Sequence, residues 1–147
     1  MVIALVAFLM IDCGNDLMKE DYLKESAKTV LLVDDDRSIL RTFTRILQKA
    51  GYETEMAESG KDALEKIQAR NYDVALVDIV LGDSSGMDLL SKIRDKSPKT
   101  VKIAITGDDS RQARDEAFVN GADAFLTKPV NPVVLLDIFE EKLKRVY

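Results

Sequence analysis

Short apolar runs and helical patterns alternate along this chain from residue 29 onward. Four of the runs are rich in Val, Ile and Leu, which is typical of strands buried on both faces. Each run ends at polar residues: Thr29–Val33 before Asp34, Val74–Val77 before Asp78, Val101–Ile105 before Thr106, and Ala124–Leu126 before Thr127 and Lys128. A more polar run over 52–57 is predicted to form an edge strand.

Apolar residues recur at helical spacing after each of these runs. The first helix carries an apolar stripe from Ile39 to Ala50, with Asp36 as its N-cap and Gly51 as its stop. Ser59 is expected to cap the second helix. The other helices are predicted around 87–93 with an end before Pro98, around 112–119 with an end near Gly121, and from the Asn131–Pro132 pair onward.

Five alternations of strand and helix predict an α/β fold, a parallel sheet with helices on both faces. All strands of a parallel sheet point the same way, and such sheets bind ligands at their carboxyl edge. The polar residues that end the four apolar runs are therefore predicted to meet in one cluster of carboxylates, a hydroxyl and an ammonium group.

The amino-acid composition limits the reactions and ligands that this cluster can support. The chain has 147 residues, 46% of them hydrophobic and 32% charged, as expected for one globular domain. Its net charge of −5 makes direct binding of nucleic acid or of an anionic membrane an unfavourable interpretation. The absence of His excludes a histidine general base, and the single Cys13 excludes an intramolecular disulfide or a cysteine cluster for metal.

Residues 1–28 are predicted to be an N-terminal extension, an apolar run and then a polar linker, before a domain over 29–147. The run Val2–Ile11 is shorter than the roughly 20 residues that span a membrane. No positive charge precedes it, as a secretory signal would require. The extension is interpreted as an extra apolar helix or as sequence upstream of a start at Met18. We expect no membrane association and a cytoplasmic location.

Four fragments, TVLLVDDD, DVALVDIVLGDSSG, KIAITG and GADAFLTKP, resemble the response-regulator receiver domain of two-component signalling. The resemblance implies a doubly wound, flavodoxin-like three-layer sandwich with strand order 2-1-3-4-5. It implies a regulatory phosphoacceptor of a phosphorelay, which catalyses only its own phosphorylation and dephosphorylation. The implied partner is a sensor histidine kinase or a phosphotransfer protein, and the regulator is stand-alone or separated from its output domain.

The same resemblance assigns roles at the predicted cluster. Asp78 is the implied phosphoacceptor. Asp35, Asp78 and the backbone carbonyl of Val80 are the implied direct ligands of Mg²⁺, which Mn²⁺ can replace, and Asp34 acts through water. Clustered carboxylates need such a cation, because two unit charges about 4 Å apart repel by ~4 kcal/mol at an effective dielectric near 20. Hard oxygen ligands are also those that Mg²⁺ prefers.

The remaining implied roles concern the phosphoryl group and its readout. Thr106 and Lys128 are expected to contact phosphoryl oxygens, which stabilises a charged transition state without a general base. Thr106 and Phe125 are the implied switch pair. A surface formed by the fourth helix, the fifth strand and the last helix is the implied partner face or homodimer interface.

Two positions depart from the family pattern. Gly82 stands where the family commonly has Pro, and Ser85 where it commonly has Asp, whereas Gly86 is retained. A glycine at position 82 is expected to loosen the loop that follows Asp78. The Lys128–Pro129 bond is expected to be cis by the same resemblance.

Two other interpretations stay open at the level of sequence. Residues 34–38 loosely fit the D-x-D-x-[TS] strand end of haloacid-dehalogenase phosphatases, which would make Asp34 the nucleophile and Asp36 a general acid but leaves Asp78 without a role. A receiver-like module that never accepts phosphate is the second. Taken singly, each polar residue of the cluster could also be a helix cap or a solvated loop residue.

Overall fold

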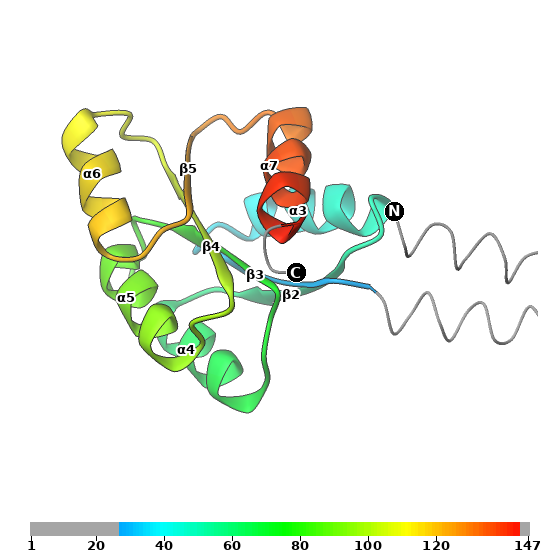
Figure 1. Ribbon diagram of the computed structural model, residues 1–147, viewed down its shortest axis with the longest axis horizontal. Helices are drawn as coiled ribbons and strands as arrows, with labels where there is room; N and C mark the ends of the chain where they lie inside the picture. The colour runs from blue at the N-terminus through cyan, green and yellow to red at the C-terminus, as the bar shows by residue number, and fades with distance from the viewer. Residues whose placement is uncertain (1–26, 145–147) are drawn as a thin grey trace, which may run out of the picture.

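A five-stranded parallel sheet forms the centre of the molecule (Figure 1). The computed structural model describes residues 27–144, so the expectations for the apolar run and for a start at Met18 lie outside the described residues. The strands are β1 (Thr29–Val33), β2 (Glu53–Ala57), β3 (Val74–Asp78), β4 (Val101–Thr106) and β5 (Ala124–Thr127). Their order is β2-β1-β3-β4-β5, which confirms the predicted topology and the edge position of the polar strand.

Each strand is followed by a helix, and the five described helices lie in the predicted places. They are α3 (Arg37–Lys49), α4 (Gly60–Ala69), α5 (Gly86–Lys96), α6 (Arg111–Val119) and α7 (Pro132–Lys144). The side chain of Asp36 accepts hydrogen bonds from the backbone N–H groups of Ser38 and Ile39, so its role as an N-cap is confirmed. Ser59 caps α4 in the same way, and Gly51 follows α3 with a φ of +96°, a left-handed conformation that glycine adopts readily.

The helices cover both faces of the sheet (Figure 1). Alternate residues of one strand point to opposite faces. Thus Leu31 and Val33 pack in a cluster with α4, α5 and α6, whereas Val30 and Leu32 pack in a second cluster with α3 and α7. The inner strands β1, β3 and β4 are largely apolar because both of their faces are buried, whereas the edge strand β2 is polar and more exposed.

The last helix is anchored to the sheet by three apolar residues at intervals of four. Leu135, Phe139 and Leu143 are all buried, and the Tyr52 ring meets the Phe139 ring edge-on at 5.3 Å. Full burial of one such side chain stabilises a fold by roughly 1.5–3 kcal/mol. This anchoring fixes the loop between β5 and α7, which carries Lys128. Among residues 27–144, no helix is long and apolar enough to cross a membrane.

Candidate functional site

The carboxyl ends of four strands bring the predicted polar residues together. Asp34 follows β1, Asp78 and Thr106 are the last residues of β3 and β4, and Lys128 follows β5. Because β1 pairs with β3, β3 with β4 and β4 with β5, residues up to 94 positions apart in sequence meet at one edge. The predicted convergence of carboxylates, a hydroxyl and an ammonium group is confirmed.

Three carboxylates form the acidic part of the site. One oxygen from each of Asp34, Asp35 and Asp78 lies within 4.8 Å of the others. Asp34 and Asp78 are buried and Asp35 is exposed, so the cluster opens to solvent on the side of Asp35. Three carboxylate oxygens at this spacing are a hard donor set that fits a divalent cation such as Mg²⁺.

Lys128 is the cation that faces these carboxylates. Its Nζ lies 2.8 Å from Oδ2 of Asp78 and 3.2 Å from Oδ2 of Asp34. Burial alone would lower the pKa of Lys128, but the hydrogen bond and charge of Asp78, together with those of Asp34, outweigh it and raise this pKa. The ammonium group therefore stays charged. The Lys128–Pro129 peptide bond is cis, as expected.

The charge of one ammonium group does not neutralise three carboxylates, and this affects the pKa of Asp34. Burial raises the pKa of Asp34. The backbone N–H of Asp36, at 2.9 Å, opposes this shift, the charge of Asp78 adds to it, and Lys128 opposes it. Excess negative charge in a buried cluster is the condition under which a bound cation is favoured.

Thr106 lies beside this cluster with its hydroxyl only partly used. The residue is buried, and among the described residues its Oγ1 is bonded to the backbone N–H of Asp108 at 3.1 Å. Phe125 is half-buried, packs against the cluster of α4, α5 and α6, and has the guanidinium group of Arg114 5.5 Å from its ring centroid. The two residues of the implied switch pair thus lie on the neighbouring strands β4 and β5.

The loop from β3 to α5 is folded closely around Asp78. The N–H of Val80 donates to Oδ1 of Asp78 at 3.0 Å, and the N–H of Gly86 donates to the carbonyl of Ile79 at 2.9 Å. A Cβ at Gly86 would collide with the backbone carbonyl of Asp78. This close approach explains why glycine is retained at that position. Ser85, where an aspartate was expected from the family, caps α5 through the N–H of Met87.

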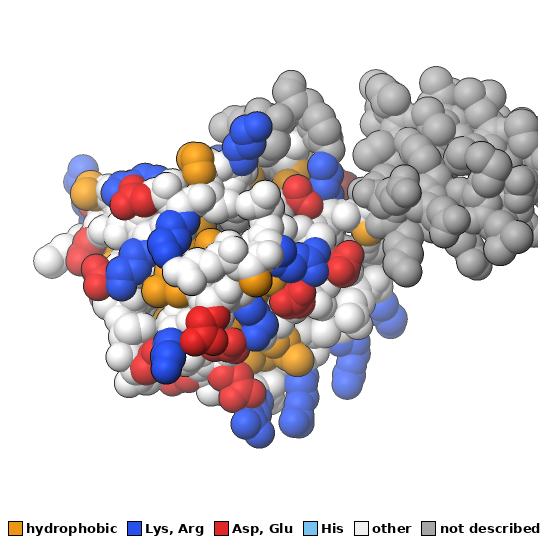
Figure 2. Space-filling model, turned by 90° about the horizontal axis from the view of Figure 1, so that it is seen from below, with side chains coloured by type: hydrophobic (Ala, Val, Ile, Leu, Met, Phe, Trp, Pro, Cys, Tyr) orange, Lys and Arg blue, Asp and Glu red, His pale blue; other side chains and the backbone are white. Residues whose placement is uncertain are grey.

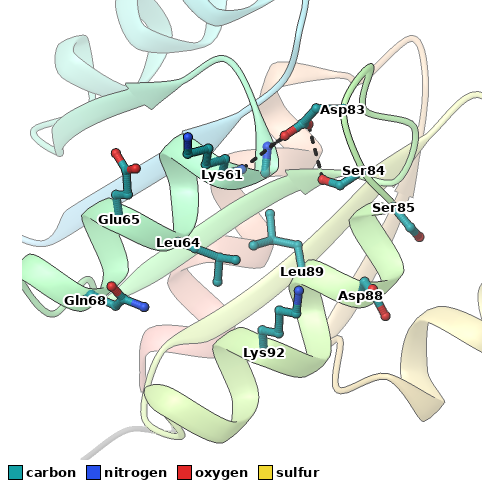
Figure 3. A pocket seen from close by; sticks show the side chains of 11 residues that line it. Lys61, Leu64, Glu65, Gln68, Asp83, Ser84, Ser85, Asp88, Leu89 and Lys92 are labelled. Carbon is teal, nitrogen blue, oxygen red and sulfur yellow. Dashed lines mark hydrogen bonds between the residues drawn. The ribbon is translucent and has the colours of Figure 1, made fainter.

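One residue of this loop was not singled out from the sequence. Asp83 accepts hydrogen bonds from the backbone N–H groups of Gly60 and Lys61, at 3.0 and 3.2 Å (Figure 3). These amides belong to the first turn of α4, more than 20 positions earlier in the chain. A polar loop residue close to the start of α5 suggests a local cap, so the sequence carried no signal for this long-range contact.

Comparison with known proteins places the chain in a family. Residues 30–140 match the response regulator receiver domain. The transcriptional regulatory protein YvrH of Bacillus subtilis is 32% identical over 120 residues, which are 81% of this chain and 50% of that protein. The chain spans about half or less of the length of the first curated relatives it matches.

Solved structures agree with this placement. A CheY-like receiver domain protein from Methanospirillum hungatei is 40% identical with a TM-score of 0.79, over 82% of this chain and 97% of that one. A response regulator from Burkholderia pseudomallei, solved with a phosphorylated aspartic acid and a calcium ion, is 29% identical with a TM-score of 0.74, over 81% and 70% of the two chains. The chain therefore belongs to the response regulator receiver domain family, whose members are regulatory phosphoacceptors rather than enzymes.

Proposed function

We propose that Asp78 accepts a phosphoryl group from the phosphohistidine of a sensor kinase or phosphotransfer protein, in a reaction that needs Mg²⁺ or Mn²⁺. The observation that carries this proposal is the arrangement of Asp78 between a carboxylate cluster and the ammonium group of Lys128. The phosphorylated aspartic acid and calcium ion in the Burkholderia pseudomallei relative support it.

Asp35, Asp78 and the carbonyl of Val80 would hold the cation directly, with Asp34 acting through water. Asp34 already accepts the N–H of Asp36 and contacts Lys128, whereas Asp35 is exposed and available. When bound, the cation supplies charge stabilisation for a transferring phosphoryl group.

The transfer itself needs little covalent chemistry from the protein. A carboxylate oxygen of Asp78 attacks phosphorus, a P–O bond forms, and the P–N bond of the donor breaks with its electron pair left on the imidazole nitrogen. Lys128 orients the carboxylate before transfer and can pair with a phosphoryl oxygen afterwards. The buried hydroxyl of Thr106 can donate to another oxygen, since a hydroxyl that accepts one bond keeps its proton to donate.

Phosphorylation would be read through the pair Thr106 and Phe125. A hydroxyl drawn toward the phosphoryl group vacates space next to β5, and the Phe125 ring can enter it only by leaving the Arg114 guanidinium. The affected surface is formed by α6, β5 and α7, where Phe118 and Val119 on α6 are exposed. We take this face as the output or homodimer surface.

We take an apolar groove of about 500 Å³ beside Lys128, whose Nζ contacts Asp78, as the docking surface for the donor protein. The groove is lined mainly by residues of α3, of the loop before α7 and of the start of α7: Ile39, Phe43, Ile46, Pro129, Val130 and Pro132. By contrast, acidic and basic side chains are interspersed over most of the face in Figure 2. This mixture, with a net charge of −5, supports a protein partner in the cytoplasm rather than nucleic acid or a membrane.

Chemical phosphorylation tests the proposal directly. The protein is incubated with acetyl phosphate and Mg²⁺, and the acyl phosphate is located by peptide mapping. We expect label on Asp78, loss of label in Asp78→Asn, and loss of label when EDTA replaces Mg²⁺. Urea unfolding of Asp78→Asn should show an intact cooperative fold.

Two other results would each select a rival function. Label on Asp34 would support the haloacid-dehalogenase interpretation, although the carboxylate of Asp36 already caps α3. An amide spectrum that does not change with Mg²⁺ and either acetyl phosphate or beryllofluoride would support a module that only binds partners.

A further inference from the structure

The loop that carries Val80 is joined to a helix from another part of the chain. Asp83 bonds through Oδ1 to the N–H of Gly60 and through Oδ2 to the N–H of Lys61, and it also accepts the hydroxyl of Ser84 at 3.2 Å. Figure 3 shows this carboxylate over the first turn of α4, beside a groove of about 290 Å³ between α4 and α5.

These bonds complete the N-terminus of α4. The first N–H groups of a helix have no partner within the helix. Ser59 serves only one of them, the N–H of Asp62 at 3.0 Å, and Asp83 serves the two before it. A carboxylate is also favoured at the positive end of the helix dipole. In keeping with this, the backbone hydrogen bond from Gly60 lowers the pKa of Asp83.

Local packing is adapted to this contact. A Cβ at Gly60 would collide with Oγ of Ser84, which would have to rotate away, so the loop approaches α4 closely at this point. On the other side of the loop, a Cβ at Gly82 would lie 3.5 Å from Oδ2 of Asp35. The loop therefore lies between α4 and an acidic residue of the candidate metal site.

The flexibility of Gly82 explains why this loop needs a contact that holds it in place. Glycine loses more backbone freedom on ordering than any other residue. A loop with glycine at this position has to be held by contacts elsewhere, and Asp83 is the next residue.

We propose that Asp83 is a positioning residue: by fastening the loop to α4, it holds Gly82 beside Asp35, fixes the loop that carries Val80, and prepares the divalent-cation site. This inference rests on the proposed function. It adds a residue that touches neither the cation nor the phosphoryl group.

The test compares two ways of removing a cap from the same helix. Asp83→Ala and Ser59→Ala each remove capping bonds of α4, but only Asp83 connects the loop. Mg²⁺ itself is titrated and its Kd read from amide chemical shifts, and unfolding by urea in EDTA gives the stability of each variant. We expect Asp83→Ala to raise the Kd about five-fold, within the range that loop ordering can supply, and Ser59→Ala to leave it within two-fold.

A proline at position 82 provides a second test of the role of Asp83. A Cβ at Gly82 would make only an ordinary contact, 3.5 Å from Oδ2 of Asp35, and the φ of Gly82 is not positive. Gly82→Pro should change the Kd of the parent protein less than two-fold, yet restore most of the affinity lost in Asp83→Ala, because it orders the loop by another route. Asp83→Asn keeps an acceptor for the N–H of Gly60 and should fall between the parent and the alanine variant.

The outcomes separate the inference from the function on which it rests. If Asp83→Ala and Ser59→Ala lower stability alike and neither changes the Kd, Asp83 is only a helix cap and the inference is overturned. The same holds if Gly82→Pro does not rescue Asp83→Ala. If the parent protein binds no Mg²⁺, or is labelled elsewhere than Asp78, the proposed function fails and the inference fails with it.

Discussion

Buried polar residues lie at both edges of the same sheet, but they are arranged in opposite ways. Among the described residues, six polar side chains are buried, and they divide evenly between the edges. Asp34, Asp78 and Thr106 lie at the carboxyl edge, and Ser97, Thr100 and Lys102 lie at or near the amino edge.

At the amino edge, each of these buried polar side chains has a hydrogen-bond or ion-pair partner. Thr100 Oγ1 donates to the carbonyl of Tyr72 at 2.7 Å and is bonded to Ser97 Oγ at 2.7 Å. Lys102 Nζ donates to the carbonyl of Thr100 at 3.0 Å and lies 3.4 Å from one carboxylate, that of Asp123. Charge and hydrogen bonds are balanced there, as in a structural network.

At the carboxyl edge, the negative charges outnumber the positive ones. One ammonium group, that of Lys128, faces two buried carboxylates, and the exposed Asp35 adds a third. Local violations of good packing and pairing are typical of functional sites. The comparison teaches that burial of polar groups does not itself mark a site, whereas an uncompensated charge within a closed fold does.

The two lysines give the sharpest test of this difference. Lys128→Met should reduce labelling of Asp78 by acetyl phosphate on the order of 10²- to 10³-fold, as loss of one stabilising donor does elsewhere. Its Mg²⁺ affinity should be kept or strengthened, because the net charge of the site becomes more negative. Initial rates of label incorporation at saturating Mg²⁺ measure the effect.

Lys102→Met is the matched control at the other edge. It should label normally per folded molecule. Its free energy of unfolding should fall by about 1–3 kcal/mol, because the carbonyl of Thr100 loses its buried hydrogen-bond donor. Equal losses of labelling in the two variants would remove the distinction between the edges.

Metal binding should stabilise the protein through the carboxyl edge alone. A cation that binds only the folded protein at 100 times its Kd adds about 2.7 kcal/mol to the free energy of unfolding. We expect this increment in the parent protein, and its loss in Asp35→Asn. Urea unfolding with Mg²⁺ and with EDTA gives the difference. An increment that survives in Asp35→Asn would place the cation elsewhere.

The two edges of the sheet differ in how much of their structure could be predicted from the sequence. The carboxyl edge was predictable, because alternation fixed a parallel sheet and each of its polar residues directly followed or ended an apolar run. Asp34, Asp78, Thr106 and Lys128 therefore converged as expected, and even the cap at Asp36 was correctly distinguished from the cluster.

Contacts of loops with distant segments could not be predicted in this way. Thr100 meets the carbonyl of Tyr72, 28 positions away, and Asp83 meets the amide of Gly60, 23 positions away. Neither pair belongs to a periodic pattern, since each depends on how a loop packs against another segment after the sheet has formed. The structure also shows that the loop containing Gly82 is tied to α4, which glycine alone did not suggest.

Thr100→Val should damage the amino edge without touching function. The substitution keeps shape but leaves the carbonyl of Tyr72 and the hydroxyl of Ser97 without their buried partner, which costs about 1–3 kcal/mol. Urea unfolding measures this loss, and labelling of Asp78 per folded molecule should equal that of the parent. A labelling defect would show that the two edges are coupled through β4.

The smallest expected effect is a dependence on pH that only the carboxyl edge should show. Since burial raises the pKa of Asp34 above its ordinary value of 3.8, the folded protein binds a proton there before the unfolded chain does. Ionised Asp34 therefore opposes folding above its folded-state pKa, and protonation relieves this as the pH falls toward 4. In EDTA, the stability of the parent relative to Asp34→Asn should rise as the pH falls from 7 toward 4, because burial raises the pKa of Asp34. Carboxylates outside the cluster titrate in both proteins and cancel in the difference. Saturating Mg²⁺ should abolish the rise, because a bound cation favours the ionised carboxylate; a rise of equal size with and without Mg²⁺ would show that Asp34 titrates independently of the cluster.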